Sequence, residues 1–425
     1  MRIRTLTGGL VAGLVLIVLQ VTPATAAAGD LDTSFSSNGK VKLDASFDGQ
    51  DVALQSDGKI VAIGSDGERM VVFRLNRDGS LDDTFSDDGI LRVRFGQAEG
   101  TFSEAEGVAL VNGDIVVVGT KFAGSITDIS LAVARINTDG TLDDTFSSDG
   151  KQTFRLSSDT RGAGVAIQAN GRIVCVGSDG DDLLVVRFKA DGTPDTTFDG
   201  DGSVTTSFTE DVEGMAVAID PATQRIVAGA QKSPTGHTED FVIARYTTTG
   251  TLDSSWSDDG ERTTSTTTDG GLQSLTVLDN SRVIAVGYTE SDTSGWQILV
   301  RKFESDGDYD DSWNDDGSIR VGFRRDGAPA DDFGFDVDVQ TDGKVVVAGT
   351  SLDGDREFAV LRLTTSGHLD DTFGGDGGVL TAFNEQAGAN GVVINNGTGK
   401  IVVMGNAITN SLNSDGMYLA RYLGS

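Results

Sequence analysis

Short apolar runs alternate with turns of Gly, Asp and Asn along most of the chain. One kind of run ends in glycine, as in KIVAIG (59–64), and a second kind carries a basic residue near its end, as in MVVFRL (70–75). Both kinds are about four to six residues long and rich in β-branched and aromatic residues, which is typical of β-strands. Because amphipathic runs of helix length are absent from the sequence, the pattern predicts an all-β protein.

Both strand patterns recur in phase with a turn motif of the form LDDTFSDDG (81–89). Copies of this motif follow each other at intervals of 50 to 61 residues. The aromatic position of the motif is occupied by Phe35, Phe85, Phe146, Phe198, Trp256, Trp313 and Phe373. Two weaker strands complete each unit, for example KVKLD (40–44) and DVALQ (51–55) in the first, so a unit contains four antiparallel strands.

Seven such units predict a seven-bladed β-propeller of four-stranded antiparallel blades. The first motif copy has no strand before it, and the chain ends just after its last basic strand, so we expect the two ends to meet in a closed ring. A closed ring removes the exposed sheet edges that a linear stack would leave. A parallel β-helix is the alternative, although its coils are usually shorter and lack four strands per unit.

The first 26 residues have the pattern of a secretory signal peptide. Arg2 and Arg4 precede an apolar run (residues 10–21), and Ala24-Thr25-Ala26 supplies small residues at a cleavage site. We therefore expect residues 1–26 to be removed and residues 27–425 to form one propeller domain, secreted or extracytoplasmic and monomeric. An uncleaved membrane anchor is the alternative, but the run is short for a span of about 20 residues.

The charge of the chain restricts its partners. The formal net charge is −32, and it becomes −34 when the two arginines leave with the signal peptide. Such acidity repels nucleic acids and anionic lipid surfaces, so we exclude nucleic-acid partners and membrane insertion of the mature chain. Cys175 aligns with Ala62 and Val347 of other units, so we expect a small buried hydrophobe.

Every motif copy has an aspartate three positions before its aromatic residue, and every basic strand has a cationic side chain near its end. These aspartates are Asp32, Asp82, Asp143, Asp195, Asp253, Asp310 and Asp370, and the cations are Arg74, Arg135, Arg187, Arg245, Lys302, Arg362 and Arg421. We expect ion pairs that fix each loop to a blade. The leucine and the aromatic residue of the motif are expected to pack between neighbouring blades. A feature that recurs in every blade indicates a structural role.

The acidic end of the motif offers a candidate calcium site. Clustered carboxylates in a glycine turn suit Ca²⁺, which takes six to eight oxygen ligands. The candidate ligands are Asp88, Asp149, Asp201, Asp259, Asp316 and Asp376. Ordinary turn chemistry is the alternative, since Asp-Gly turns need no metal and the spacing differs from that of an EF-hand. No other cofactor is indicated.

As a whole, the unit LDxTFxxDG, followed by a DGKIVVxG strand and a VxRx strand, resembles the delta-60 repeat. This is a family of bacterial β-propeller proteins, and the resemblance covers essentially all of residues 27–425. It implies a propeller fold, export and a bacterial origin, and it implies no catalytic residues. The fourth unit departs from the pattern, because Pro194 replaces the leucine.

Catalytic chemistry has little support in the sequence. The two histidines, His237 and His368, lie in different units, so a histidine metal site or a catalytic triad lacks residues. We therefore favour a binding or scaffold module over an enzyme. The alternative function is a secreted hydrolase or lyase acting on extracellular glycans, through paired carboxylates.

Variation between units indicates where a partner would bind. The loops before the basic strands and the loops between the first and second strands of a unit vary widely, and both sets are expected on one face of the propeller. The opposite face carries the regular acidic turns. The aromatic residues of the variable loops are Phe102, Phe122, Trp296 and Phe333. Exposed aromatic side chains favour contact with an extracellular protein or glycan, although each could instead cap its own blade.

Overall fold

A computed structural model describes residues 26–43, 47–96, 100–124, 128–232, 241–264, 269–291, 295–325, 328–410 and 413–424. The predicted signal peptide lies, apart from Ala26, outside these ranges. Within them the chain consists of strands and turns, and they contain no helix of the length and apolar character that a membrane crossing needs.

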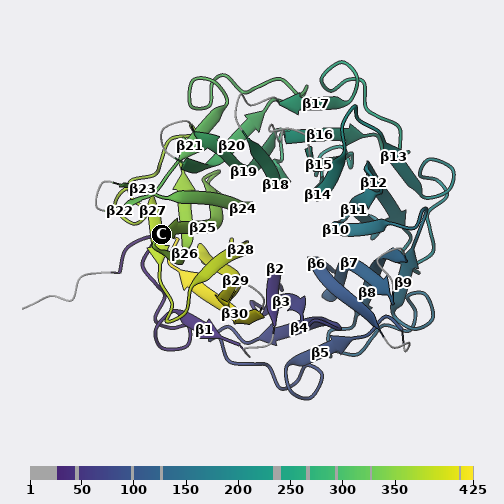
Figure 1. The fold of residues 1–425 in the computed structure, drawn as a ribbon, viewed down its shortest axis with the longest axis horizontal. Coiled ribbons are helices and arrows are strands. Elements are labelled where there is room, and N and C mark those ends of the chain that lie inside the picture. Colours follow the sequence, from purple (N-terminus) through teal and green to yellow (C-terminus); the bar gives the residue numbers. More distant parts are fainter. Residues whose placement is uncertain are drawn as a thin grey trace, which may run out of the picture.

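Seven four-stranded antiparallel sheets surround a central axis, which confirms the predicted seven-bladed β-propeller (Figure 1). Blades 1 to 4 contain β2 (Asp48–Leu54), β3 (Ile60–Ser65), β4 (Met70–Leu75) and β5 (Ile90–Val93); β6 (Thr101–Val111), β7 (Asp114–Ala123), β8 (Ile129–Ile136) and β9 (Lys151–Phe154); β10 (Thr160–Ile167), β11 (Ile173–Asp179), β12 (Asp182–Phe188) and β13 (Ser203–Thr206); and β14 (Val212–Ile219), β15 (Ile226–Lys232), β16 (Phe241–Tyr246) and β17 (Glu261–Thr264). Blades 5 to 7 contain β18 (Gly270–Val277), β19 (Val283–Ser291), β20 (Gly295–Phe303) and β21 (Ser318–Val321); β24 (Asp331–Val339), β25 (Val345–Asp353), β26 (Asp355–Leu363) and β27 (Gly378–Thr381); and β28 (Ala387–Asn395), β29 (Lys400–Asn410), β30 (Asn413–Tyr422) and β1 (Lys40–Lys42). A short ribbon of β22 (Arg324–Arg325) and β23 (Ala328–Pro329) connects blades 5 and 6.

The two ends of the chain meet in blade 7. β1 pairs antiparallel with β30, with Val41 opposite Leu419, so the outermost strand of the last blade comes from the start of the propeller. The strand after each motif copy is therefore the outer strand of the preceding blade, and the assignment of KVKLD to the same blade as DVALQ was wrong. The reason is that the motif connects the third strand of a blade to its fourth, whereas the step to the next blade follows the fourth strand.

Each innermost strand has a β-bulge at the same place. The bulge leaves one residue of the strand without a cross-strand partner, namely Gln50, Glu106, Ala163, Met215, Gln273, Phe335 or Asn390. All seven line a cavity along the central axis. The second strand passes close to the bulge, so that a Cβ at Gly119 or Gly349 would collide with a carbonyl group of the inner strand. This close approach explains why the second strand of a blade has the run that ends in glycine, such as KIVAIG (59–64).

The hydrophobic core consists of seven clusters, one between each pair of neighbouring blades. One motif aromatic lies in each cluster and is at most 1% exposed, as expected. The predicted packing of the motif leucine holds in some blades only: Leu31, Leu142 and Leu252 are partly buried and pack against a core cluster, whereas Leu81 and Leu369 are 38% and 40% exposed. The leucine forms a backbone bridge to the end of the third strand, for example Leu81 with Leu75 and Leu142 with Ile136.

The predicted ion pairs form in all seven blades. Arg187 donates from Nε to Oδ2 of Asp195 at 2.8 Å, and Lys302 lies 3.0 Å from Asp310 in blade 5. The six arginines also donate from Nη1 to a backbone carbonyl group of the next blade, for example Arg187 to Thr248 at 2.6 Å. Lys302 makes no such bond among the described residues. The interface between blades 5 and 6 thus lacks a cross-blade hydrogen bond that the other six interfaces have.

Candidate functional site

The predicted partner-binding residues fall into two separate places. Phe102 (β6) and Phe122 (β7) are cross-strand partners in blade 2, and their rings stack on each other with 4.4 Å between centroids. The guanidinium of Arg161 covers Phe122 at 5.9 Å. Because each ring occupies the face of the other, this pair has the geometry of a blade cap.

Trp296 and Phe333 meet across the interface between blades 5 and 6. Their ring centroids lie 5.7 Å apart with 29° between the ring planes. Tyr288 (β19) contacts both rings edge-on, at 5.4 and 5.2 Å, and Phe335 (β24) lies 6.5 Å from Phe333. The amide of Trp296 donates to Oδ1 of Asp331 at 3.0 Å, which connects β20 to the next blade. Four aromatic side chains from two blades thus form one cluster.

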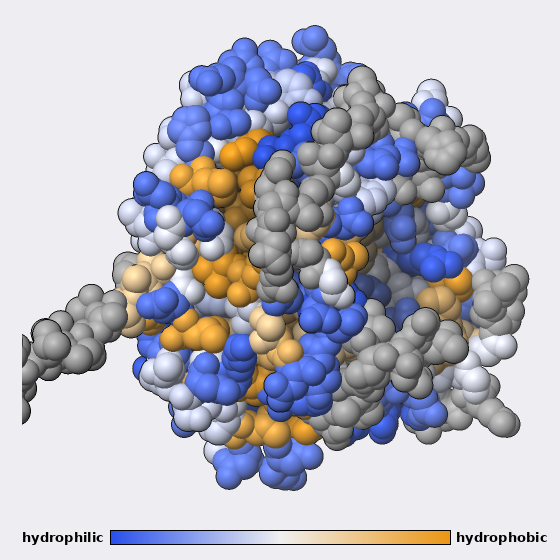
Figure 2. Space-filling view, turned by 60° about the vertical axis from the view of Figure 1, so that its left-hand side comes forward, coloured by the Kyte–Doolittle hydropathy of each residue, from blue (hydrophilic) through white to orange (hydrophobic). Residues whose placement is uncertain are grey.

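This cluster borders a cavity of about 370 Å³ that we call the aromatic pocket. Its lining consists of Gln273, Tyr288, Phe333, Phe335, Thr350, Leu352 and Arg356. Gln273 and Phe335 also belong to the ring of bulge residues, so the pocket adjoins the central cavity. Figure 2, which brings the side of the ring with β21 to β27 forward, shows hydrophobic areas among hydrophilic side chains.

Two polar side chains of the aromatic pocket lack partners within the described part of the chain. Arg356 forms no ion pair there, and its Nε has no hydrogen-bond acceptor. Burial lowers the pKa of Arg356, and no carboxylate beside it offsets that shift. The hydroxyl of Thr350 also has no partner, although this residue is only 2% exposed. A Cβ at Gly388 of blade 7 would collide with both groups, so glycine leaves the space that they occupy.

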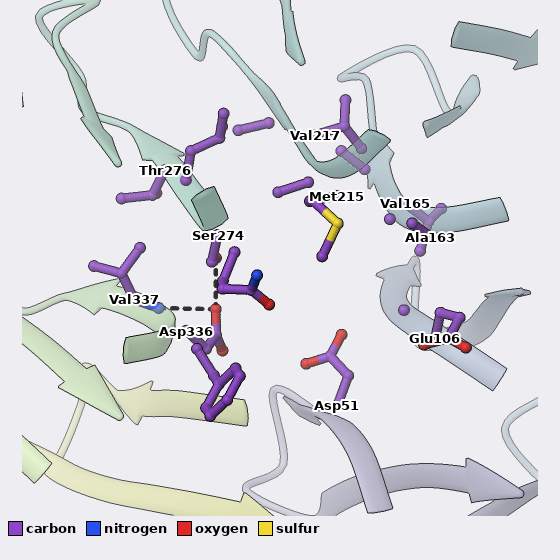
Figure 3. Close-up of a pocket in the computed structure, with 18 of the residues that line it drawn as sticks. Asp51, Glu106, Ala163, Val165, Met215, Val217, Ser274, Thr276, Asp336 and Val337 are labelled. Carbon is purple, nitrogen blue, oxygen red and sulfur yellow. Dashed lines mark hydrogen bonds between the residues drawn. The ribbon is translucent and has the colours of Figure 1, made fainter. Parts of the chain in front are cut away.

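The central cavity, of about 610 Å³, is lined by carboxyl groups from different blades (Figure 3). Asp51 of blade 1 accepts from the amide of Val108 in blade 2 at 2.9 Å. Asp336 of blade 6 accepts from the hydroxyl of Ser274 in blade 5 and from the amide of Val392 in blade 7, both at 2.7 Å. These aspartates therefore connect neighbouring blades at the inner end of the ring.

Burial raises the pKa of the carboxyl groups in this region. The pKa of Asp51 and Asp336 is raised by burial, and for Asp336 the charge of Asp51 adds to the effect. Burial also raises the pKa of Glu106 to about 8, helped by Glu104 and Glu213. Neutral carboxyl groups in a cavity can donate as well as accept hydrogen bonds, which makes this a polar and adaptable lining.

The candidate calcium ligands lie at the ends of the repeated motif turns, on the face of the propeller opposite the variable loops. Each of them accepts a hydrogen bond from the backbone amide two residues later, as Asp88 does from Ile90 at 2.9 Å; the others are Asp149, Asp201, Asp259, Asp316 and Asp376. This is the geometry of an Asx turn. Across the ranges that the structure describes, His, Cys, Asp and Glu form no group of three or more that could hold a metal ion.

The remaining candidates have ordinary environments. The thiol of Cys175 is fully buried, as predicted, and burial raises its pKa. His368 is exposed and its Nδ1 lies 2.9 Å from Oδ1 of Asn314. His237 lies outside the described residues.

Sequence reasoning missed Tyr288, Phe335, Thr350 and Arg356. Three of them lie within strands that resemble their counterparts in other blades, so their residue types attracted no notice. An alignment of the seven inner strands would have found the bulge position of Phe335, because Gln, Glu, Ala, Met, Gln, Phe and Asn occupy it in turn. Arg356 also lies in a strand, β26, but it comes before the run FAVLRL (358–363) by which the sequence pattern defined that strand.

Solved structures of propellers resemble the whole ring. Virginiamycin B lyase from Staphylococcus aureus matches with a TM-score of 0.53 and 10% identity, over 90% of this chain and 98% of that one. A catalytically inactive form of the same lyase with quinupristin matches with a TM-score of 0.52 and 10% identity, over 90% and 99% of the two chains. At this identity the likeness extends to the fold alone. No curated protein matches the chain in sequence.

A family model described as "Domain of unknown function (DUF5122) beta-propeller" matches residues 55–85, 112–146, 168–198, 225–255 and 340–373. Each segment runs through the second and third strands of a blade and ends at or next to the motif aromatic. Blade 5, which contributes Tyr288 and Trp296, lies outside these segments. These segments of the chain are similar to the repeat that this family model describes.

Proposed function

We propose that the protein is an exported binding module and that the aromatic pocket between blades 5 and 6 is its ligand site. The observation that carries this proposal is that Tyr288, Phe333 and Phe335, from two blades, line one cavity, while Trp296 packs against Tyr288 and Phe333. Ligand sites in proteins are typically apolar, aromatic-lined cavities with a few polar groups, and they often lie where units of a fold meet.

The distribution of repeated and unique features supports this location. The ion pairs, Asx turns and motif aromatics recur around the ring, so they serve the scaffold. Within the described ranges, the stacked pair in blade 2 belongs to a single blade, whereas Tyr288, Phe333 and Phe335 line a cavity between two blades together with the unpartnered Arg356 and Thr350. A site for one ligand needs only one copy, and the pocket meets that condition.

Export and a monomeric state are part of the proposal. The pattern of residues 1–26 supports export, as does the resemblance of the repeat unit to the delta-60 family. The excess of 65 acidic over 33 basic residues supports partners other than nucleic acids. An extracellular glycan is the partner that we expect, because flat aromatic faces stack on the C–H face of a sugar ring.

Affinity electrophoresis of the mature protein tests the proposal. Wild type, F333A and F102A are run in native gels that contain single extracellular polysaccharides. We expect at least one polysaccharide to retard wild type and F102A, and we expect F333A to lose this retardation. F102A is the matched control because it removes an aromatic ring from the pair in blade 2. Retardation that F333A retains, or that no polysaccharide produces, would contradict the proposed site.

The same polysaccharides test the alternative role. A secreted hydrolase or lyase would release shorter products on incubation. The raised pKa of Glu106 favours such chemistry, because a protonated carboxyl group can act as a general acid. Release of products that E106Q abolishes would replace the binding role by the enzymatic one.

Calcium stabilisation of the repeated turns stays a separate prediction. Melting of the mature protein in millimolar Ca²⁺ and in excess chelator tests it. A ligand at a hundred times its Kd stabilises by about 2.7 kcal/mol per site, so several occupied turns would raise Tm strongly. Equal melting temperatures would leave the turn aspartates with their Asx role alone.

A further inference from the structure

We propose that the aromatic pocket binds a carboxylate-bearing sugar ring of an acidic polysaccharide, with Arg356 as the carboxylate ligand and Phe333 and Phe335, which line the pocket, as the stacking surface. The inference rests on the proposed function and adds the chemical class of the ligand. It is argued from the two unpartnered polar groups of the pocket, from the aromatic rings and from the size of the cavity.

Arg356, which is partly buried, differs from the buried arginines that pair with motif aspartates. Arg187 and Arg362 are at most 2% exposed, and each pairs with a motif aspartate at 2.8 Å. Arg356 forms no ion pair with any carboxylate that the structure describes, although acidic residues outnumber basic ones about two to one in this chain. A desolvated guanidinium without a partner is costly, and a bound carboxylate would satisfy it through two parallel N–H···O bonds.

Thr350 adds a second group that needs an acceptor or a donor. Its hydroxyl is buried without a hydrogen bond, and Gly388 leaves space around both this hydroxyl and Arg356. A buried hydroxyl without a partner costs about 1–3 kcal/mol. Two neighbouring unsatisfied groups in one cavity indicate a polar ligand atom, and a carboxylate has enough lone pairs for both.

The aromatic rings select the rest of the ligand. Phe333 and Phe335 line the pocket, and behind them Trp296 stacks on Phe333 at 29° while Tyr288 meets Trp296 and Phe333 edge-on at 76° and 74°. The cavity of about 370 Å³ lies near the lower end of the range for small-ligand sites, which suits one or two sugar rings. A sugar acid combines an apolar ring face with a carboxylate, whereas an acidic peptide side chain offers the carboxylate alone.

Tryptophan fluorescence provides a direct measurement. Of the three tryptophans in the chain, Trp256 and Trp313 are at most 1% exposed, so Trp296 is the one that a ligand can reach. The mature protein is titrated with oligogalacturonate, with its methyl ester and with polyglutamate. The variants are R356Q and, as a matched control, R161Q, because Arg161 also lies beside an aromatic ring but pairs with Asp159 at 2.7 Å.

We expect oligogalacturonate to change the emission of wild type and of R161Q with the same affinity. The methyl ester should bind at least tenfold more weakly, and R356Q should bind the acid as weakly as wild type binds the ester. Equal affinity for acid and ester would overturn carboxylate recognition, and so would an absence of any emission change with the acid. Tighter binding of polyglutamate would overturn the choice of a sugar. If a neutral polysaccharide still retards wild type but not F333A, the proposed function survives the failure of this inference.

Discussion

Arg421 and Asp32, which are 389 positions apart in the sequence, form an ion pair with 2.7 Å between Nε and Oδ2. Both residues are less than 10% exposed, and Arg421 also donates to the carbonyl group of Arg77 in blade 1. The same contact exists in the other blades between residues that are eight positions apart. In blade 7 it closes the ring, together with the pairing of β1 and β30.

Removal of the closing arginine should therefore weaken the whole propeller. We expect R421M to lose about 3–5 kcal/mol of unfolding free energy, because it leaves Asp32 with Lys400 as its remaining cation and deletes the bond to blade 1. R421K should lose less, since lysine serves in this place in blade 5. Denaturant unfolding of the mature protein checks both values. R421M as stable as wild type would show that the strand pairing alone closes the ring.

The interface between blades 5 and 6 can be given the hydrogen bond that it lacks. In K302R the new guanidinium should pair with Asp310 and donate to a carbonyl group of blade 6, as Arg245 does to Ser305 at 2.7 Å. We expect a gain of about 0.5–1.5 kcal/mol, the usual net value of one such bond. Thermal unfolding measures the change, and K42R at the exposed pair with Glu385 serves as a control for the substitution itself. A fall in Tm would mean that the interface has no space for arginine.

The pKa shifts divide the pH dependence of stability into two parts. The motif aspartates, such as Asp370 with a pKa of about 2, have values below the ordinary value of 3.8, so their contribution is lost as the pH falls below about 4. Glu106 has a raised pKa of about 8, so the folded state loses stability as the pH rises from about 4.5 to 8 and the carboxyl ionises.

The variant E106Q tests the pH dependence that comes from Glu106, because the glutamine side chain is uncharged at every pH. We expect E106Q and wild type to melt at similar temperatures at pH 5, whereas at pH 8.5 the variant should melt higher. D83N, which removes an exposed negative charge from a turn, should show no such change with pH. A constant difference between E106Q and wild type across this range would contradict the raised pKa.

The sequence allowed the fold to be predicted further than the site. Repetition of LDDTFSDDG marked each interface between blades, because an aromatic residue such as Phe85 is needed there every time. It could not show that Leu142 packs against the core while Leu81 is 38% exposed, since both have the same place in the motif and the same backbone bridge. The contact between Trp296 and Phe333 could not be predicted from the sequence either, because it depends on how blades 5 and 6 pack against each other. Arg356 could be recognised as a candidate only from the structure, which shows that it forms no ion pair with a described carboxylate.

Thr350 offers a test that separates stability from binding. Because its hydroxyl is buried without a partner, T350V should stabilise the ligand-free protein by about 1 kcal/mol, since valine has nearly the same shape and no unsatisfied group. The matched control is T381V, in which the lost hydroxyl accepts a hydrogen bond from Tyr422 at 2.8 Å, and this variant should be destabilised. Denaturant unfolding gives both values, and fluorescence titration with oligogalacturonate should show weaker binding by T350V alone. If T350V proves less stable than wild type, the hydroxyl is satisfied in the free protein and its role as a ligand group fails with it.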